Sequence, residues 1–293
     1  MRFIHLSDPH LTTLDGCRPR DLRGKRLLGY LSWRRRRRFE HRRAHLDALV
    51  DAVRRQGGDQ LLVSGDLTHL GLPAELQAAR GWLETLGEPG RVTVVPGNHD
   101  VFARGSMAAV VQAWSPYLHL DGDAGYPAVR NFDGVQIINS CSAVPTAPLL
   151  ASGRLGKTQL DRLRRVLDVS FDGVRILVIH HPPFSGMISR RKALTDAPAL
   201  ERLAVGHINL VLHGHGHRNS EFQRGAVTVL GTTSASLPGA SFRVIDIGEH
   251  AGDFDFVTRL HERRADGSFA ATAEQRFRID PARRRASRRS AAG

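Results

Sequence analysis

The chain has 293 residues, of which 41% are hydrophobic and 24% are charged, and its formal net charge is +13. A chain of this length and composition buries a substantial apolar core, which excludes disorder as its main state. The longest uninterrupted apolar run, residues 107–111, is far shorter than the roughly 20 residues that a membrane-spanning helix requires. Cys17 and Cys141 lack the paired spacings of a disulfide scaffold or a thiolate zinc site. Residues 1–8 leave no room for the apolar stretch of a secretory signal, and we expect a cytoplasmic location.

The basic charge is concentrated in two segments. Residues 18–43 hold 12 Lys and Arg against two acidic residues, and residues 276–293 hold seven Arg against one Asp. We therefore expect one domain over residues 1–275 with a basic insertion at 18–43, followed by a basic, disordered tail at 276–293. Such segments are attracted to phosphate polyanions or anionic lipid headgroups, or they serve only as solvated surface.

Hydrophobic spacing predicts strands that alternate with helices. In chain order we expect a strand at 2–6, a helix around 46–53, a strand at 60–64, a helix around 73–86, a strand at 91–95, a helix around 160–167, and strands at 174–179 and 208–212. This alternation requires crossover connections, and it favours a largely parallel, buried sheet. Closely spaced segments at 226–230, 242–247 and 254–260 predict antiparallel pairing instead.

Polar side chains that can bind metals follow five of the predicted strands. They are Asp8 and His10, Asp66, Asn98 and His99, His180, and the pair His215 and His217. In open α/β sheets, ligands bind outside the carboxyl ends of the strands, so we expect all five groups to meet in one crevice. The i, i+2 spacing of the two pairs lets both side chains of a pair point the same way in extended backbone.

Without His99, this set supplies two carboxylates, one amide oxygen and four imidazoles. Mixed oxygen and nitrogen ligands suit Mn, Fe, Zn or Co. Seven ligands exceed what one ion needs, and a two-metal centre with a bridging carboxylate uses the surplus. Each residue alone has an ordinary structural explanation, for example Asp66 in an Asx-turn. The metal-site prediction depends on their conjunction.

Five short motifs resemble those of the calcineurin-like metallophosphoesterase superfamily. They are Asp8-Pro9-His10, Gly65-Asp66, Gly97-Asn98-His99-Asp100, His180-His181-Pro182-Pro183 and Gly214-His215-Gly216-His217, in a match that covers about residues 2–247. The resemblance implies a four-layer α/β/β/α sandwich of two mixed sheets, with a dinuclear site of two divalent or mixed-valence ions at its rim.

The resemblance also implies a role for each residue. One metal falls to Asp8, His10, Asp66 and His217, and the other to Asp66, Asn98, His180 and His215, with Asp66 bridging. His99, paired with Asp100, resembles the histidine that contacts the phosphate and helps the leaving group. We expect a metal-bridging hydroxide to attack the phosphorus, His99 to protonate the leaving oxygen, and Asp100 to hold the ring of His99.

Two further segments resemble the cyclic-nucleotide phosphodiesterase-like branch of the superfamily. These segments are Gly153-Arg154-Leu155-Gly156 with Gln159-Leu160, and residues 196–203. Asp66 is followed by Leu67-Thr68-His69, and His99 by Asp100, unlike protein serine/threonine phosphatases. We therefore expect a phosphoester small-molecule substrate, not a phosphoprotein. His213 departs from the resemblance, because many relatives have a small residue there.

The basic insertion allows three hypotheses. Leu27, Leu28, Tyr30, Leu31 and Trp33 precede Arg34 to Arg38, and Phe39 follows. Residues 27–39 resemble an interfacial anchor on an anionic membrane, which suggests a lipid-linked pyrophosphate as substrate. The same run could track nucleic-acid phosphates, as in a nuclease. In the third hypothesis, Trp33 and the leucines pack against the body with the arginines outward. A metal-binding scaffold without turnover is the non-enzymatic alternative.

Overall fold

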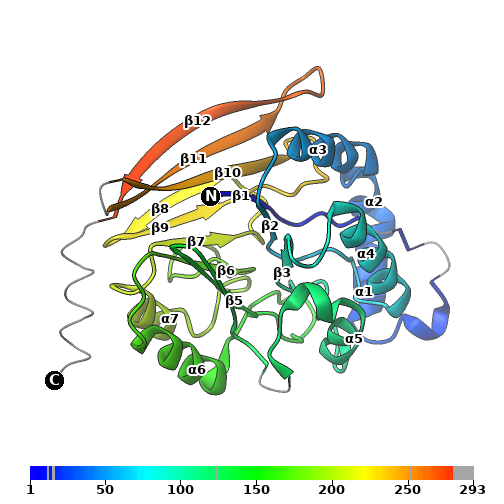
Figure 1. Ribbon diagram of the computed structural model, residues 1–293. Helices are drawn as coiled ribbons and strands as arrows, with labels where there is room; N and C mark the ends of the chain where they lie inside the picture. Colours follow the sequence, from blue (N-terminus) through cyan, green and yellow to red (C-terminus); the bar gives the residue numbers. More distant parts are fainter. Residues whose placement is uncertain (12, 15–16, 123–124, 251–252, 280–293) are drawn as a thin grey trace.

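The computed structural model describes residues 1–279 except 12, 15, 16, 123, 124, 251 and 252. Two six-stranded mixed sheets form the centre of the molecule, and helices cover their outer faces (Figure 1). Within the described residues, no helix is long and apolar enough to cross a membrane.

The first sheet combines three parallel strands with three antiparallel ones. Its order is β12 (Phe269–Arg278), β11 (Asp253–Arg263), β10 (Ser241–His250), β1 (Arg2–Leu6), β2 (Gln60–Val63) and β3 (Val92–Val94). Strand β1 is parallel to β2 and antiparallel to β10, so that Ile4 lies opposite both Leu61 and Val244. The predicted antiparallel pairing of the later strands is confirmed for β10 and β11.

The second sheet has a parallel centre with an antiparallel strand at each edge. Its order is β4 (Ala128–Phe132), β5 (Val135–Ser140), β6 (Val174–Ile179), β7 (Leu210–His213), β9 (Val227–Gly231) and β8 (Ser220–Arg224). Strands β5, β6, β7 and β9 are parallel neighbours. Parallel strands place their carboxyl ends at one edge, which is where the predicted metal-binding residues follow β6 and β7.

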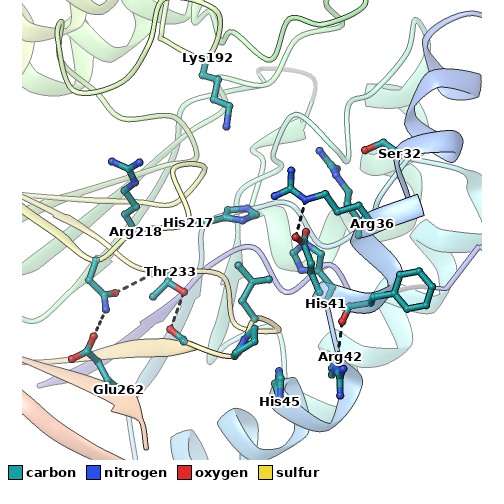
Figure 2. A pocket seen from close by; sticks show the side chains of 17 residues that line it. Ser32, Arg36, His41, Arg42, His45, Lys192, His217, Arg218, Thr233 and Glu262 are labelled. Carbon is teal, nitrogen blue, oxygen red and sulfur yellow. Dashed lines mark hydrogen bonds and ion pairs between the residues drawn. The ribbon is translucent and has the colours of Figure 1, made fainter. Parts of the chain in front are cut away.

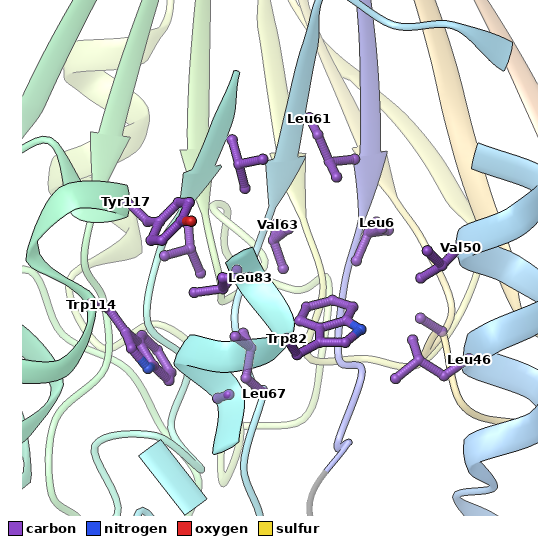
Figure 3. Close-up of a cluster of buried hydrophobic side chains, with 14 of the residues drawn as sticks. Leu6, Leu46, Val50, Leu61, Val63, Leu67, Trp82, Leu83, Trp114 and Tyr117 are labelled. Atoms are coloured by element: carbon purple, nitrogen blue, oxygen red, sulfur yellow. The ribbon is translucent and has the colours of Figure 1, made fainter. Parts of the chain in front are cut away.

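Three hydrophobic layers hold the four structural layers together. Helices α3 (Arg43–Gln56), α4 (Pro73–Leu86) and α5 (Ser106–Leu118) pack on the first sheet, with Trp82, Trp114 and Leu46 in their shared core (Figure 3). Helices α6 (Gly156–Asp168) and α7 (Ala197–Ala204) pack on the second sheet through Leu163 and Leu200. A third core lies between the sheets. The predicted four-layer α/β/β/α sandwich is confirmed.

Strand β1 contributes to two of these cores because its side chains alternate. Ile4 and Leu6 belong to the core under the helices, whereas Phe3 belongs to the core between the sheets. Burial on both faces explains why residues 3–6 lack a solvent-facing polar alternation, and the one polar member, His5, is buried and bonds to the Ser64 hydroxyl at 2.8 Å. The carboxyl end of β1 is thereby fixed between the two sheets, where Asp8 follows it.

The sequence analysis missed several elements. Helix α5 carries Val110, Ala113, Trp114 and Tyr117 at helical spacing on its buried face, a pattern that was present in the sequence. Strands β4, β5 and β12 were also not predicted. Strand β12 ends at Arg278, so ordered structure extends three residues into the predicted tail. Residues 280–293, the rest of that tail, lie outside the described residues.

The basic insertion is largely helical. It contains α1 (Lys25–Ser32), a π-helical turn at Trp33–Arg37 and the short α2 (Arg38–Glu40). Trp33 is buried in a small core with Leu14, Leu70, Leu72 and Phe102. Leu27, Leu28 and Phe39 remain 45%, 48% and 57% exposed. The packing hypothesis therefore holds for Trp33 but not for the exposed leucines.

Candidate metal centre

The predicted metal-binding residues meet at the rim where β1, β2, β3, β6 and β7 end. Their potential ligand atoms form two groups within 4.8 Å, one of Asp8, His10 and His217 and one of Asp66, His180 and His215. A third such group contains His10, Asp66 and His99. Residues separated by up to 209 positions in the chain thus converge on one place.

Asp66 lies between the two groups. Its Oδ2 atom is 3.8 Å from Nε2 of His10 and 3.3 Å from Nε2 of His180. The carboxylate therefore faces an imidazole of each group. A carboxylate that bridges two ions needs this position.

Short distances also join the other members of the set. Nε2 of His217 is 3.1 Å from Oδ1 of Asp8. On the other side of Asp66, Nε2 of His180 is 3.2 Å from Oδ1 of Asn98 and 3.2 Å from Nδ1 of His215. All seven residues predicted as ligands are therefore brought together.

Backbone carbonyls orient three of the imidazoles. The Nδ1 atoms of His10 and His180 donate to the carbonyls of Thr68 and Ser64 at 2.9 and 2.7 Å, and Nε2 of His215 donates to Lys192 at 3.0 Å. Such partners fix the tautomer, so that the opposite nitrogen is unprotonated and faces the centre. The rings are thus prepared to bind a cation.

Five of the seven residues have left-handed backbone conformations. Their φ angles are 52° for Asp8, 38° for His10, 57° for Asp66, 66° for His215 and 49° for His217. Residues other than glycine rarely adopt this backbone region. It costs about 1–3 kcal/mol per residue, and it persists only where the surrounding structure enforces it. The i, i+2 pairs do converge, but the expected extended backbone was wrong: left-handed turns after each strand bring the side chains together.

Two glycines make this convergence sterically feasible. A Cβ atom on Gly97 would clash with the side chain and backbone N of Asp66. A Cβ atom on Gly214 would clash with Oγ of Ser7 and Oδ2 of Asp8. Both positions need glycine because another chain segment occupies the place of a side chain.

His99 lies at the centre, but Asp100 is not its partner. Nδ1 of His99 donates to the carbonyl of His69 at 2.6 Å, and Nε2 accepts from Nη1 of Arg37 at 2.8 Å. The prediction that Asp100 holds the ring of His99 was wrong. The Asp100 carboxylate instead accepts hydrogen bonds from the backbone N–H groups of Asp66, Gly97 and Thr68 and from the hydroxyl of Thr68.

Burial controls the protonation of the imidazoles. It lowers the pKa of His10 and of His215 well below the usual value, which favours the neutral, metal-binding form. Burial acts in the same direction on His180 and is the largest single influence, but the charge and hydrogen bond of Asp66, the charge of Asp8 and the Ser64 carbonyl together outweigh it and raise the pKa to about 9. At this position the negative charge of the centre attracts a proton, whose place a metal cation can take.

Two nearby histidines stay outside the three groups. His181 has both ring nitrogens engaged, Nδ1 with the Ser142 hydroxyl at 2.7 Å and Nε2 with the Ala151 carbonyl at 3.2 Å. Nδ1 of His213 bonds to the Gly214 carbonyl at 3.0 Å. Neither residue belongs to a ligand cluster of the described residues.

Two pockets open beside the centre. The larger, of about 1180 Å³, is lined by His217, Lys192, Arg218 and residues of the insertion such as Arg36 and His41 (Figure 2). The smaller, of about 250 Å³, is lined by residues that include Asn98, His99, Leu28, Leu149 and Leu150. Ser32, Arg37 and Lys192 line both pockets. The sequence analysis did not single out Arg37, His41 or Lys192, because a run of basic residues does not reveal which member turns inward.

The family model for calcineurin-like phosphoesterases matches residues 1–219. The chain belongs to the calcineurin-like phosphoesterase family. This phosphoesterase is 31% identical over 194 residues, 65% of its chain and 70% of the relative, to a Synechococcus sp. protein named "Probable cyclic nucleotide phosphodiesterase". A protein of the same name from Vesicomyosocius okutanii is 25% identical over 197 residues, 66% of this chain and 77% of the relative.

A solved structure shares the fold of this calcineurin-like phosphoesterase. The crystal structure of a dimetal phosphatase from Danio rerio superposes with a TM-score of 0.64 at 15% identity, covering 96% of this chain and 99% of that one. The protein is a hydrolase of phosphoric ester bonds. The family and the ligand clusters together indicate a dinuclear site for divalent metals.

Proposed function

We propose that this phosphoesterase hydrolyses phosphodiesters, with cyclic nucleotides as the first substrates to test. One ion would be held by Asp8, His10, Asp66 and His217, and the other by Asp66, Asn98, His180 and His215. The position of the Asp66 carboxylate between the two groups, 3.8 Å from His10 and 3.3 Å from His180, carries this assignment. The mixed oxygen and nitrogen set suits Mn, Fe, Zn or Co.

A pair of such cations supplies a hydroxide nucleophile at neutral pH and stabilises charge on the phosphoryl group. The chain supplies the orientation. Carbonyl hydrogen bonds hold His10, His180 and His215, and Asp100 fixes the turn that carries Asp66. Asn98 and His99 line the smaller pocket beside the proposed ligands, where they could contact the phosphoryl oxygens of a bound substrate. In the described hydrogen-bond pattern, Nε2 of His99 carries no proton and accepts from Arg37, so His99 could protonate the leaving oxygen, as predicted, only after Nε2 has taken up a proton.

The phosphodiester preference rests on two supports. The relatives that match most of the domain are named for cyclic nucleotide phosphodiesterase activity. The sequence after Asp66 and after His99 also departs from the pattern of protein phosphatases. Both supports favour a small phosphodiester over a phosphoprotein.

The deciding experiment compares Asp66→Ala with wild type on bis-p-nitrophenyl phosphate and on cyclic AMP in the presence of Mn. We expect Asp66→Ala to lose turnover and to bind fewer than two ions per chain by elemental analysis, with its circular dichroism unchanged. The matched control is Asp47→Asn, which changes an exposed carboxylate on α3 and should keep both the turnover and the two bound ions. Ordinary turnover by Asp66→Ala would refute the assignment. Two bound ions without turnover of any phosphoester would favour the metal-binding scaffold.

A second candidate substrate is a lipid-linked pyrophosphate at a membrane surface. The supporting observation is the smaller pocket, where Leu28, Leu149 and Leu150 are 48%, 83% and 38% exposed beside Asn98 and His99. An apolar tail could leave the centre along these leucines, while exposed Arg34 and Arg38 face anionic headgroups. Sedimentation with anionic and neutral vesicles tests this, and equal binding to both excludes it. Single-stranded DNA in the same substrate panel tests the nuclease alternative.

A further inference from the structure

The five consecutive arginines of the insertion are not equivalent. Arg34, Arg35, Arg36 and Arg38 are exposed, whereas Arg37 is partly buried. Nη1 of Arg37 lies 2.8 Å from Nε2 of His99, 62 residues away in the chain. One arginine of the run therefore turns into the metal centre.

Contacts on both sides of Arg37 fix this direction. Trp33, at the other end of the π-helical turn, is buried among Leu70, Leu72 and Phe102. Following Arg37, the backbone N–H of His41 donates to its carbonyl at 2.9 Å. Nδ1 of His41 pairs with the Ser236 hydroxyl at 2.7 Å, and its ring contacts that of His10 at a centroid distance of 4.5 Å. The chain is thus anchored before and after Arg37.

The guanidinium of Arg37 forms no ion pair within the described residues, and Asp66 and Glu40 act on it only at longer range. Its neighbour Arg36 pairs with Glu40 at 2.7 Å, but the hydrogen bonds of Arg37 go only to the ring of His99. A guanidinium offers five N–H donors, so most of those of Arg37 remain available in the described part of the chain. An arginine held at a metal centre with free donors is suited to a carboxylate or phosphate oxygen.

The two pockets place a substrate beside this group. Arg37, Ser32 and Lys192 line both of them, so Arg37 lies at the junction between the His217 side and the Asn98 side. Figure 2 shows Lys192 and His217 facing the open space of the larger pocket, with Arg36 across from them. A phosphoester on the centre therefore lies next to Arg37.

We propose that Arg37 binds a phosphoryl oxygen of the substrate, so that the basic insertion supplies part of the active site. This inference rests on the proposed phosphoesterase centre. When the phosphate arrives, Arg37 either gives up its hydrogen bond to His99 or donates to His99 and the phosphate together. Its charge then stabilises the phosphoryl oxygens that become more negative in the transition state. The insertion then contributes to substrate affinity and to the catalytic rate, independently of what its exposed arginines contact.

Arg37→Ala tests the proposal, with Arg37→Lys as the conservative variant and Arg35→Ala as the matched control. Arg35 is exposed and lines neither pocket. For Arg37→Ala we expect kcat/KM on bis-p-nitrophenyl phosphate to fall about 10²–10³-fold, the loss typical of one donor to a developing oxyanion. We expect inhibition by inorganic phosphate to weaken at least about tenfold, with two ions still bound. Arg37→Lys should recover part of the loss, and Arg35→Ala should match wild type.

A double variant separates direct contact from mere support of His99. If Arg37 contacts phosphate itself, adding Arg37→Ala to His99→Ala weakens phosphate binding further. If Arg37 only positions His99, the second substitution has no additional effect, and that result overturns the proposal. An unchanged phosphate inhibition constant in Arg37→Ala overturns it as well.

Phosphate binding to the Mn-loaded protein, measured by calorimetry, distinguishes the two proposals. If no phosphodiester is turned over by wild type, the proposed function fails. Weaker phosphate binding by Arg37→Ala than by Arg35→Ala would still support Arg37 as an anion-binding residue. Equal phosphate binding by the two variants would reject it, whatever the turnover.

Discussion

The carboxylate of Asp100 accepts the backbone N–H of Asp66 at 2.9 Å. The same oxygen accepts from Gly97 at 2.8 Å, so Asp100 ties together the two turns that carry Asp66 and Asn98. Asp100 is fully buried, and its other oxygen accepts from both the backbone and the hydroxyl of Thr68. Its role in the structure is to hold the metal-binding turns.

We expect Asp100→Ala to destabilise the protein by about 3–5 kcal/mol, because it leaves several buried N–H groups without an acceptor. Metal affinity should fall about 10–100-fold, as is typical when the support of a ligand is removed. Urea unfolding and Mn titration measure the two effects. Thr68→Val removes the hydroxyl that donates to both Asp100 and the His99 carbonyl, and provides a milder variant with a loss of about 1 kcal/mol. A loss of turnover with unchanged stability and metal affinity would contradict this role.

Gly97→Ala should disable the centre through a steric effect. Its Cβ would overlap the side chain and backbone N of Asp66, so the turn after β2 has to move. We expect a loss of bound metal together with a lower melting temperature. The metal content by elemental analysis and the thermal unfolding midpoint measure this.

Gly81→Ala is the matched control for that substitution. Gly81 lies within α4, and a Cβ there would meet nothing within 4 Å. Since glycine costs about 0.5–1 kcal/mol relative to alanine inside a helix, this variant should be slightly more stable than wild type. A lower stability would mean that the new methyl group meets other atoms at this position of α4.

Trp33→Ala should detach the insertion from the body. The indole fills the small core with Leu14, Leu70, Leu72 and Phe102, and Arg37 depends on this anchor for its direction. We expect trypsin to cleave within residues 18–43 at least about tenfold faster than in wild type, since local opening exposes the arginines. Phe39→Ala, at an exposed apolar position, should not change the rate. Equal cleavage of both variants would mean that Trp33 does not hold the segment.

Metal binding should stabilise the fold strongly. Five ligand residues have φ between 38° and 66°, and bound cations favour this arrangement over the unfolded chain. At 100 times the dissociation constant, binding contributes about 2.7 kcal/mol, which corresponds to a rise of roughly 4–5 °C in the melting temperature of a chain of 293 residues. Differential scanning calorimetry with and without Mn measures it. Asp66→Asn should lose most of the rise, and an equal rise in both proteins would indicate binding elsewhere.

Asp246 should make stability depend on pH in the acid range. Burial would raise its pKa, but hydrogen bonds from Arg2 and Arg259 outweigh burial and lower the pKa below its usual value. A lowered carboxyl pKa stabilises the fold above about pH 4, and the contribution disappears as pH falls through the folded value. Asp246→Asn should therefore cost about 1 kcal/mol or less at pH 7 and nothing near pH 2. A loss that is independent of pH would contradict this.

The metal centre was predictable from the sequence because its residues follow strands that are themselves easy to recognise. Strands such as Val174–Ile179 are largely apolar, with Arg175 as the one charged residue, and His180 marks where the apolar run stops. The topology of α/β sheets then brings such positions together without any knowledge of distances. This is why residues as distant as Asp8 and His217 could be grouped correctly.

The contacts of Asp100 and Arg37 were not predicted, because the direction in which each side chain points is not set by its neighbours in the sequence. Asp100 follows His99, which suggested a contact between neighbours, but the turn sends the carboxylate toward Asp66 and Gly97. Arg37 is surrounded by identical residues, and only the burial of Trp33 and the π-helical turn decide that it faces inward. The left-handed conformation of the ligands likewise follows from packing between segments, not from residue type.

Residues 18–43 lie between His10 and Asp66 in the chain, so part of the lining of both pockets comes from a stretch that carries none of the proposed metal ligands. Residues 18–43 can therefore be exchanged without removing a residue that we assign to the ions. A chimera that replaces only this segment should still bind two ions while its substrate preference changes.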